Sequence, residues 1–477
     1  MKLKQLLRGL EGLEVRGSRE VEIHGLSSDS RTVAPGDLFI ARKGEKYDGS
    51  LFIAQAIRTG AVAVVTDLYD PFLDQTQIIC PEPGKWEALL AARFYQNPSQ
   101  ELFCVGVTGS KGKTTTSYLV HHLLQGLGKS AGLMSTIETV VGEERFFSSL
   151  TTHEPIYNQK MLREMITRGC QAAVLEVSSI GLDLGRTEQI DFAIGIFTNL
   201  YPDHLDYHKS VEHYALAKKK LTTQVKEKII VNQDSDWTTS LLEGVKLDRL
   251  SFGVQTSADL MAKDPIFSAQ GTQLELCFQN QKAHLHTPLM GLHNIYNLLA
   301  AAAVGIHLGA SLDTICQILS SFQSVPGRLE RVVNDRGIAV FVDYAHTGEA
   351  LSSVLQHLRQ STPGRLFVVF GCGGNRDPAR RIGMAQAADQ YADVAIVTTD
   401  NPRTEDPKEI ERQIVRAFQK ITPQCEPDRK QAIAHALFQA RPGDIVLIAG
   451  KGHEKTQIFA NQTLPFDDVL VAKESLI

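Results

Sequence analysis

The sequence predicts a three-domain α/β protein, and three observations support this fold class. The chain has 477 residues, which is more than one hydrophobic core normally holds. Short apolar runs alternate with helical patterns, and most of these runs are apolar on both faces, as in a covered parallel sheet. Residues 97–99 and 326–327, Asn-Pro-Ser and Pro-Gly, interrupt the pattern as linkers do. We therefore expect domains at residues 1–98, 99–325 and 326–477.

The elements expected in the first two domains follow from these patterns. In the first domain, a helix at 51–59 leads into a buried strand at 62–65. The second domain is expected to hold a mainly parallel sheet, because its strands alternate with helices. Its strands are expected at 102–107, 173–177, 191–197 and 228–232, and its clearest helices at 114–127 and 294–308.

The third domain repeats the alternation and is expected to be a second doubly wound, Rossmann-like domain. Its strands are expected at 338–342, 366–370, 393–398 and 444–448, and its helices at 380–390, 407–420 and 430–440.

Composition narrows the class of protein. The net charge of −5 shows no basic bias, which argues against nucleic acid as the main partner. Seven cysteines, an odd number without C-x-x-C spacing, favour a reducing compartment over a disulfide scaffold or zinc cluster. The N-terminus has no apolar signal region, and no run of 18 apolar residues occurs. We expect a cytoplasmic protein without membrane insertion.

A Gly-rich segment after the strand at 102–107 predicts a phosphate-binding loop. Glycines let backbone N–H groups turn toward a phosphate, and the following helix N-terminus favours an anion. A lysine can reach the terminal phosphates, and a threonine hydroxyl can bind Mg²⁺. Val107 stands where the strict pattern has its first glycine, and Gly106 comes one residue early, so a turn without a ligand remains the alternative. The loop residues are Thr108, Gly109, Ser110, Lys111, Gly112, Lys113 and Thr114.

Two further strand ends carry candidate metal ligands. Glu176 ends an apolar strand, where a carboxylate is costly unless it is paired or bound to metal. His204 follows the strand at 191–197, and strand carboxyl ends line the crevice of an open α/β sheet. A solvated glutamate and a structural histidine are the alternatives.

Several motifs in order resemble one family, the Mur ligases of peptidoglycan synthesis. The similarity spans nearly the whole chain. It implies a UDP-binding domain, a central P-loop ATPase and a C-terminal domain that binds the incoming amino acid. The motifs are 108–115, Glu176-Val177-Ser178-Ser179, Asn199 with Asp203-His204, the pair Asn294 and Asn297, 326–330, 343–347 and 371–377.

The resemblance also implies roles for residues of the ATP site, with ATP and Mg²⁺ as cofactors. Thr114, Glu176 and His204 match metal ligands. Lys218 matches a lysine that the family carbamylates, and a carbamate resembles a carboxylate ligand; an unmodified lysine on a basic helix face is the alternative. Lys113, Glu176, His204 and Lys218 are thus the expected catalytic set. Further ATP contacts are expected from Asn294, Arg328 and Asp343.

The UDP-sugar substrate has matching positions in the first two domains. Ser28 and Ser30, with residues 45–47, match a uridine loop, although ordinary turn chemistry also explains two serines. Four departures from the family pattern leave sugar contacts open: His153, Ile180, Leu184 and Gly348. The positions that match pyrophosphate and sugar contacts are Thr151, Thr152, Ser178 and Arg186.

The expected amino acid is meso-diaminopimelate, because the segment Asp400-Asn401-Pro402-Arg403 resembles family members that add it. An arginine fork can pair with the second carboxylate that L-lysine lacks. A surface turn is the alternative. Arg376, Gly450 and Glu454 match the remaining contacts.

These features together predict a ligase, expected to be a monomer, that activates the D-Glu carboxylate of UDP-MurNAc-L-Ala-D-Glu as an acyl phosphate and couples it to diaminopimelate. An L-lysine-adding ligase, a folylpolyglutamate synthase-like ligase and a nucleotide-gated binding protein are the alternatives.

Overall fold

The computed structural model describes residues 1–477 except 45, 46, 269, 270, 361 and 477. The chain forms two compact units. The first comprises residues 1–263, 276–283 and 295–319, and the second comprises 264–275, 284–294 and 320–477.

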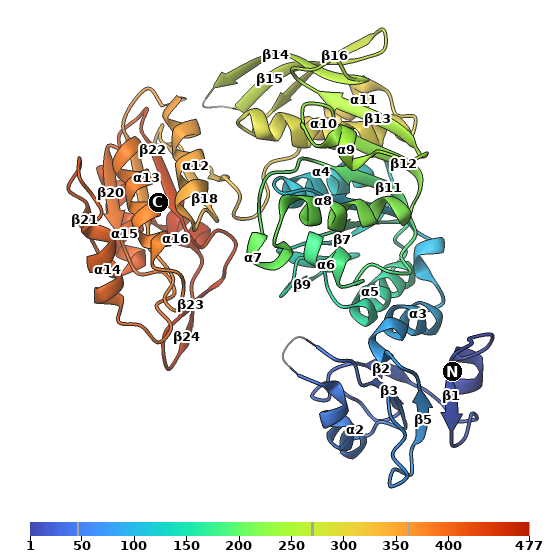
Figure 1. The fold of residues 1–477 in the computed structure, drawn as a ribbon. Coiled ribbons are helices and arrows are strands. Elements are labelled where there is room, and N and C mark those ends of the chain that lie inside the picture. The colour runs from blue at the N-terminus through green and yellow to red at the C-terminus, as the bar shows by residue number, and fades with distance from the viewer. Residues whose placement is uncertain (45–46, 269–270, 361, 477) are drawn as a thin grey trace. The chain divides into compact units, whose positions relative to one another are not determined.

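The chain begins with a five-stranded sheet, which Figure 1 shows in blue. The strand order is β1-β5-β4-β3-β2, and all neighbours are parallel except β1 and β5. Helix α3 (Pro83–Phe94) buries Leu90 and Ala91 against the same core as strand residues such as Leu38. The strands are β1 (Glu14–Arg16), β2 (Gly25–Ser27), β3 (Asp37–Ile40), β4 (Ala63–Thr66) and β5 (Thr76–Ile79), with α1 (Leu3–Leu6) and α2 (Ile53–Thr59) beside them.

The second sheet has eleven strands in the order β16-β15-β14-β13-β12-β11-β6-β10-β7-β8-β9. Its middle, from β13 to β7, is parallel. Its strands are β6 (Phe103–Thr108), β7 (Ala131–Met134), β8 (Glu138–Val141), β9 (Glu144–Phe147), β10 (Ala172–Glu176), β11 (Phe192–Phe197), β12 (Val225–Asn232), β13 (Asp248–Gly253), β14 (Leu260–Ser268), β15 (Gly271–Phe278) and β16 (Gln281–Thr287).

Helices connect the parallel strands, as the sequence predicts. Helix α4 (Lys113–Gly126) starts directly after the Gly-rich segment and buries Leu119, Val120 and Leu123. The other helices are α5 (Pro155–Thr167), α6 (Ser179–Asp183), α7 (Leu205–His208), α8 (Val211–Lys219), α9 (Thr238–Leu241), α10 (Leu292–His307) and α11 (Leu312–Ser320).

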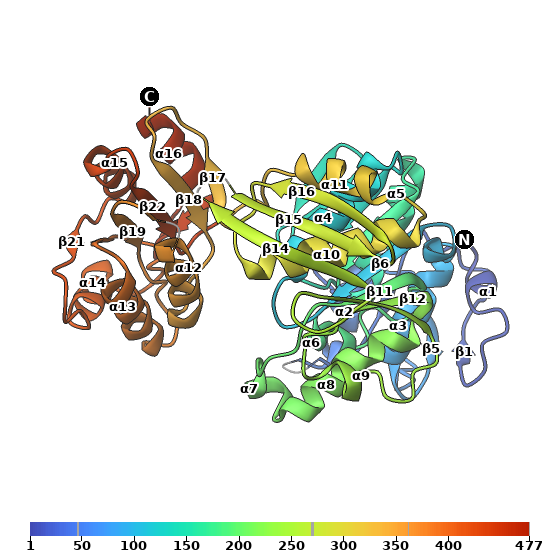
Figure 2. The same cartoon turned by 90° about the horizontal axis from the view of Figure 1, so that it is seen from above.

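The run β14 to β16 is a structural feature that the sequence patterns did not reveal. These three strands lie in a row at one edge of the sheet (Figure 2). Strand β16 alternates buried and exposed residues, as in Ala283 and His284, which is typical of a sheet with one covered face.

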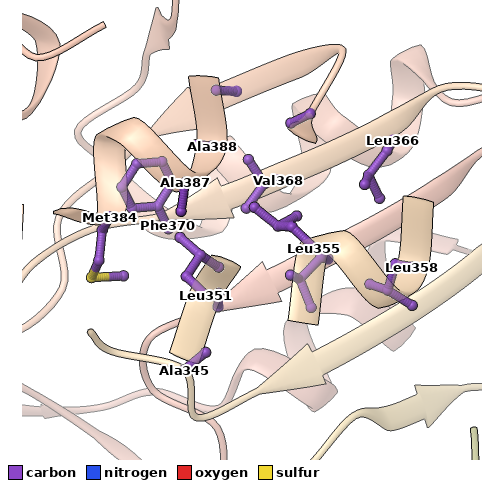
Figure 3. Close-up of a cluster of buried hydrophobic side chains, with 14 of the residues drawn as sticks. Ala345, Leu351, Leu355, Leu358, Leu366, Val368, Phe370, Met384, Ala387 and Ala388 are labelled. Atoms are coloured by element: carbon purple, nitrogen blue, oxygen red, sulfur yellow. The ribbon is translucent and has the colours of Figure 1, made fainter. Parts of the chain in front are cut away.

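The third sheet has the order β17-β18-β22-β19-β20-β21 and is parallel from β18 to β21. Leucines of α12 (Gly348–Gln360) pack against β19, together with Met384 and alanines of α13 (Ala379–Tyr391) (Figure 3). The other elements are β17 (Glu330–Val332), β18 (Ala339–Asp343), β19 (Leu366–Phe370), β20 (Val394–Val397), β21 (Gln424–Cys425), β22 (Ile445–Ala449), β23 (Thr456–Ile458), β24 (Thr463–Pro465), α14 (Pro407–Val415), α15 (Arg429–Gln439) and α16 (Asp468–Leu476).

The predicted fold class, three α/β domains with mainly parallel sheets, is confirmed. One helix differs in length, because α14 ends at Val415 rather than near residue 420. The N–H groups of residues 419–421 instead bond to the Asp389 carboxylate, which draws the chain out of the helix.

Candidate active site

The Gly-rich loop lies at the carboxyl edge of the central sheet, between β6 and α4. Strand β6 is flanked by β10 and β11, so Glu176 and Thr198 come from the strands on either side of it. Parallel strands place their carboxyl ends at one edge. The three segments expected to bind phosphate and metal therefore lie side by side.

Thr198 and Asn199 fix the shape of the loop. Thr198 Oγ1 donates to Lys111 O at 2.7 Å, and Asn199 Oδ1 accepts from Lys111 N at 2.9 Å. Gly109 has a φ of +149°, and a Cβ there would lie 1.9 Å from Thr198 Oγ1. Only glycine allows this close approach. Ser110 Oγ is held between Tyr201 O at 3.0 Å and the Tyr214 hydroxyl at 2.8 Å.

Two lysines converge on this loop. Lys113 Nζ donates to Gly109 O at 2.9 Å and Ser110 O at 3.1 Å. Lys218 Nζ, on α8, donates to the same Gly109 O at 2.9 Å. Burial and the nearby Lys113 ammonium lower the pKa of Lys218 well below its ordinary value. Burial thus shifts the equilibrium of Lys218 away from the ammonium and toward the neutral amine.

Glu176 is 1% exposed and is held on one side only. Its Oε2 accepts from the backbone N–H and the hydroxyl of Thr136. Its other oxygen, Oε1, is buried without a hydrogen-bond partner. A buried carboxylate oxygen with unused lone pairs suits a hard cation such as Mg²⁺, and Glu176 therefore fits the predicted metal role.

His204 lies close to the loop but does not complete a metal cluster. It has a φ of +53° at the start of α7, and its ring centroid lies 6.4 Å from that of Tyr214. Asp203, beside it, approaches Lys111 Nζ at 3.5 Å. In the described part of the chain, no three His, Cys, Asp or Glu side chains are grouped to hold a metal ion.

Four predicted substrate residues gather around Glu176. Thr152 Oγ1 donates to Ser178 Oγ at 3.1 Å, and Arg186 Nη1 donates to Thr152 O at 3.0 Å. Thr151 Oγ1 lies 3.0 Å from Thr136 Oγ1, whose own proton goes to Glu176, so Thr151 is the donor. The Nε of Arg186 is buried without a partner. This unused donor is suited to an anionic ligand.

His153, one of the departures from the family pattern, is a buried structural residue. Its Nε2 bonds with Ser148 Oγ at 2.7 Å, and its ring stacks on Tyr157 with centroids 4.2 Å apart. Burial, with a contribution from Arg186, lowers the pKa of His153 to about 4. The ring is therefore neutral near pH 7.

The two predicted uridine serines are bonded to side chains of their own domain. Ser28 Oγ donates to Glu87 Oε1 at 3.0 Å, and Ser30 Oγ donates to Gln55 Oε1 at 3.1 Å. Arg42 Nη1 lies 3.3 Å from Glu87 and 2.6 Å from Glu154, which in turn pairs with Arg186 at 2.9 Å. A charge network thus runs from Ser28 to Arg186. Residues 45 and 46 of the expected loop lie outside the described residues.

Asn294, Arg328 and Asp343 belong to the second unit, whereas the Gly-rich loop belongs to the first. Asn294 Nδ2 donates to Met290 O at 2.8 Å. Asp343 ends β18 and accepts from the N–H groups of Leu329 and Ala345. Burial raises the pKa of Asp343, against the opposing effect of Arg328.

The residues expected to bind the amino acid lie at the carboxyl edge of the third sheet. Arg403 Nη1 donates to Gly374 O at 2.8 Å, which ties the loop after β20 to the loop after β19. Gly450 packs so closely that a Cβ would lie 2.9 Å from Asp400 Oδ2. Asn401 Nδ2 donates to Glu454 Oε2 at 2.8 Å. Pro402, which lies between Asn401 and Arg403 in the sequence, is buried, whereas Arg376 is exposed.

The sequence patterns missed three residues that hold this machinery in place. Thr136 orients Glu176, Tyr214 fixes Ser110, and Lys451 bonds to Asn401 and Glu454. Lys451 stands two residues after the end of the buried strand β22, where a lysine is unusual, so its position was a signal. Nothing in the sequence around Thr136 or Tyr214 distinguishes them from ordinary surface or core residues.

Family models match three stretches of the chain. They are described as "Mur ligase family, catalytic domain" at residues 22–92, "Mur ligase middle domain" at 107–305 and "Mur ligase, glutamate ligase domain" at 327–452. The chain belongs to the Mur ligase family, as the motifs predicted.

Within this family, the chain is similar to ligases of one description. A UDP-N-acetylmuramoyl-L-alanyl-D-glutamate--2,6-diaminopimelate ligase of Chlamydia caviae is 42% identical, over 100% of this chain and 99% of its own length. A ligase of the same description from Caldanaerobacter subterraneus is 38% identical, with the same two shares. A solved structure of such a ligase has 30% identity and a TM-score of 0.72, covering 100% of this chain and 98% of its own.

In the described part of the chain, no helix is both long enough and apolar enough to cross a membrane.

Proposed function

We propose that this chain joins meso-diaminopimelate to the D-Glu carboxylate of UDP-MurNAc-L-Ala-D-Glu, with ATP as the energy source, in the synthesis of peptidoglycan precursors. The observation that carries the proposal is the match, over the full chain, to ligases described by this reaction. The Gly-rich loop and the loops after β19, β20 and β22 supply the chemistry that the reaction requires.

ATP binds at the loop 108–114. Backbone N–H groups of the loop and the N-terminus of α4 face the phosphates, and Lys113 exchanges its bonds to Gly109 O and Ser110 O for the terminal phosphate oxygens. The γ-phosphoryl group passes to the substrate carboxylate, which forms an acyl phosphate and ADP. The amine of diaminopimelate then attacks the acyl carbon, and inorganic phosphate leaves.

Mg²⁺ supplies charge neutralisation for the phosphoryl group. Glu176 would hold it through Oε1, the oxygen that no protein group uses, with Thr114 and His204 as further ligands. Lys218 would join them as a carbamate. Its buried, neutral amine is the form that adds CO₂ with release of one proton, so the lowered pKa favours this modification.

The substrate's anionic groups lie against Thr151, Thr152, Ser178 and Arg186, and its uridine against the loop of Ser28 and Ser30. The unpartnered Nε of Arg186 supports this placement. In the C-terminal domain, Arg403 pairs with the second carboxylate of diaminopimelate, and Glu454 accepts from an ammonium. Arg376 and Gly450 complete the contacts.

Phosphate release tests the proposal. Purified protein receives ATP, Mg²⁺ and UDP-MurNAc-L-Ala-D-Glu, with either meso-diaminopimelate or L-lysine. Release only with diaminopimelate supports the proposal. Release with lysine instead points to the lysine-adding ligase, and release with neither refutes the assigned substrates. Lys113→Ala should abolish ADP formation, and normal turnover of that variant would refute the role of the loop.

Arg403→Ala tests the basis of amino-acid choice. A hydrogen bond to a charged group is worth about 1.5–3 kcal/mol, so losing the fork should lower kcat/KM for diaminopimelate by roughly 10²-fold or more. Any phosphate release that the wild type gives at a high concentration of L-lysine should not fall in the variant. Equal loss with both amines would show that Arg403 only supports the loop through Gly374.

A further inference from the structure

Lys451 stands two residues after the end of β22, and its side chain is fully buried. Its Nζ donates to Asn401 Oδ1 at 3.0 Å and to Glu454 Oε2 at 3.1 Å. Lysine is almost never buried completely unless it is paired, because an ammonium loses its hydration. These two side chains therefore provide the partners that make the burial of Lys451 tolerable.

The same three side chains form a closed network. Asn401 Nδ2 donates to Glu454 Oε2 at 2.8 Å, and Asn401 Oδ1 also accepts from Ile458 N at 2.9 Å. The amide of Asn401 therefore has one orientation, with its oxygen toward two donors and its nitrogen toward the carboxylate. Glu454 Oε2 accepts two bonds.

This arrangement leaves one carboxylate oxygen of Glu454 available to a ligand. The side chain of Glu454 is 31% exposed, whereas that of Lys451 is 0% exposed. Oε2 is turned toward the buried lysine and asparagine, so Oε1 is the oxygen available to a ligand. Lys451 itself does not reach the surface, and it can act on a ligand only through Asn401 and Glu454.

We propose that Lys451 is a positioning residue for the incoming amino acid: it holds Glu454 and Asn401 in the geometry that accepts the ammonium group. The proposal rests on the proposed function, which assigns Glu454 to that group.

The test uses the full chain and replaces lysine by methionine at two positions, one of which is a control. Lys451→Met keeps the length of the side chain and removes its charge and donors. Lys455→Met is the matched control, because Lys455 lies four residues along the same loop, is 60% exposed and pairs with Asp467 at 2.7 Å. Glu454→Gln and the double variant Lys451→Met/Glu454→Gln complete a cycle.

Steady-state phosphate release is measured against diaminopimelate, ATP and the UDP-sugar substrate. Lys451→Met should raise KM for diaminopimelate roughly 10- to 100-fold, with KM for the other two substrates unchanged. Lys455→Met should match the wild type. The double variant should be no worse than Glu454→Gln alone, because Lys451 acts through Glu454. A merely structural role would not produce this non-additivity.

An unchanged KM for diaminopimelate in Lys451→Met would overturn the proposal, as would effects that multiply in the double variant. If Glu454→Gln binds diaminopimelate normally, the assignment of Glu454 fails, and the positioning role of Lys451 fails with it. If Lys451→Met shows no cooperative thermal unfolding, Lys451→Gln, which keeps one donor, is judged by the same two criteria.

Discussion

Gly109→Ala is the substitution whose cost the structure defines most directly. The new Cβ would lie 1.9 Å from Thr198 Oγ1 and 3.1 Å from Asn199 O. Thr198 would have to move, and the hydrogen bond that its hydroxyl donates to Lys111 O would be lost. This bond contributes about 0.5–1.5 kcal/mol, and the strained backbone adds about 1–3 kcal/mol.

We therefore expect Gly109→Ala to destabilise the protein by about 1.5–4.5 kcal/mol and to raise KM for ATP. Gly128→Ala, just beyond the end of α4, is the control. Its φ is +78°, but nothing lies within 4 Å of the added Cβ, so only about 1–2 kcal/mol of backbone strain applies. Calorimetric unfolding and ATP-dependent phosphate release measure both variants.

Equal losses of stability in these two variants would refute the reasoning, because the contact with Thr198 would then carry no cost. A wild-type KM for ATP in Gly109→Ala would show that the loop does not need this close approach to bind nucleotide.

Three further predictions concern charged side chains. Glu176→Gln should abolish Mg²⁺-dependent phosphate release in a Mg²⁺ titration without lowering the melting temperature, because the carboxylate is buried with one oxygen unpaired; preserved activity would exclude it as a ligand. Burial raises the pKa of Asp234, but hydrogen bonds from the N–H groups of residues 254–256 outweigh it and lower the pKa to about 2. Because this pKa is below that of the unfolded chain, the stabilisation by Asp234 is complete above about pH 4 and is lost toward pH 2. In urea unfolding, the difference in stability between wild type and Asp234→Asn should therefore shrink from about pH 4 to about pH 2, and a constant difference would contradict the prediction. Asp468→Asn should cost about 3–5 kcal/mol in chemical unfolding, because the fully buried Arg429 loses its partner; a change below about 1 kcal/mol would mean that water or another group replaces Asp468.

Periodicity predicted the parallel strands at the centre of the second and third sheets and β4 of the first, whereas the parallel strands β2, β3, β5, β7, β13 and β21 were not predicted. The run at 102–107 became β6, Phe103–Thr108, and the run at 444–448 became β22, Ile445–Ala449. Buried parallel strands are continuously apolar, so their sequence signal is strong. Strands β14 to β16 were not predicted, because a sheet with one covered face mixes polar and apolar residues and its signal is weak.

The site could be predicted where its residues are close together in the sequence or follow the ends of predicted strands. The Gly-rich loop is contiguous in the chain, and strand order alone places Glu176 and Thr198 beside it. The roles of individual residues in substrate contact remain predictions. The domain boundaries expected at residues 98 and 325 also remain predictions. Sequence comparison with the family supplied the substrate, which no pattern of spacing could give.

The sequence by itself determined the alternation of strands and helices, the family and the Gly-rich loop between β6 and α4, because each depends on residues that are neighbours in the chain. Only the tertiary structure decided which charges are paired. Lys451 and Asn401 are 50 residues apart, and Arg429 and Asp468 are 39 apart. Whether such a buried charge is stable depends on partners that folding brings together, and local sequence does not encode that distance.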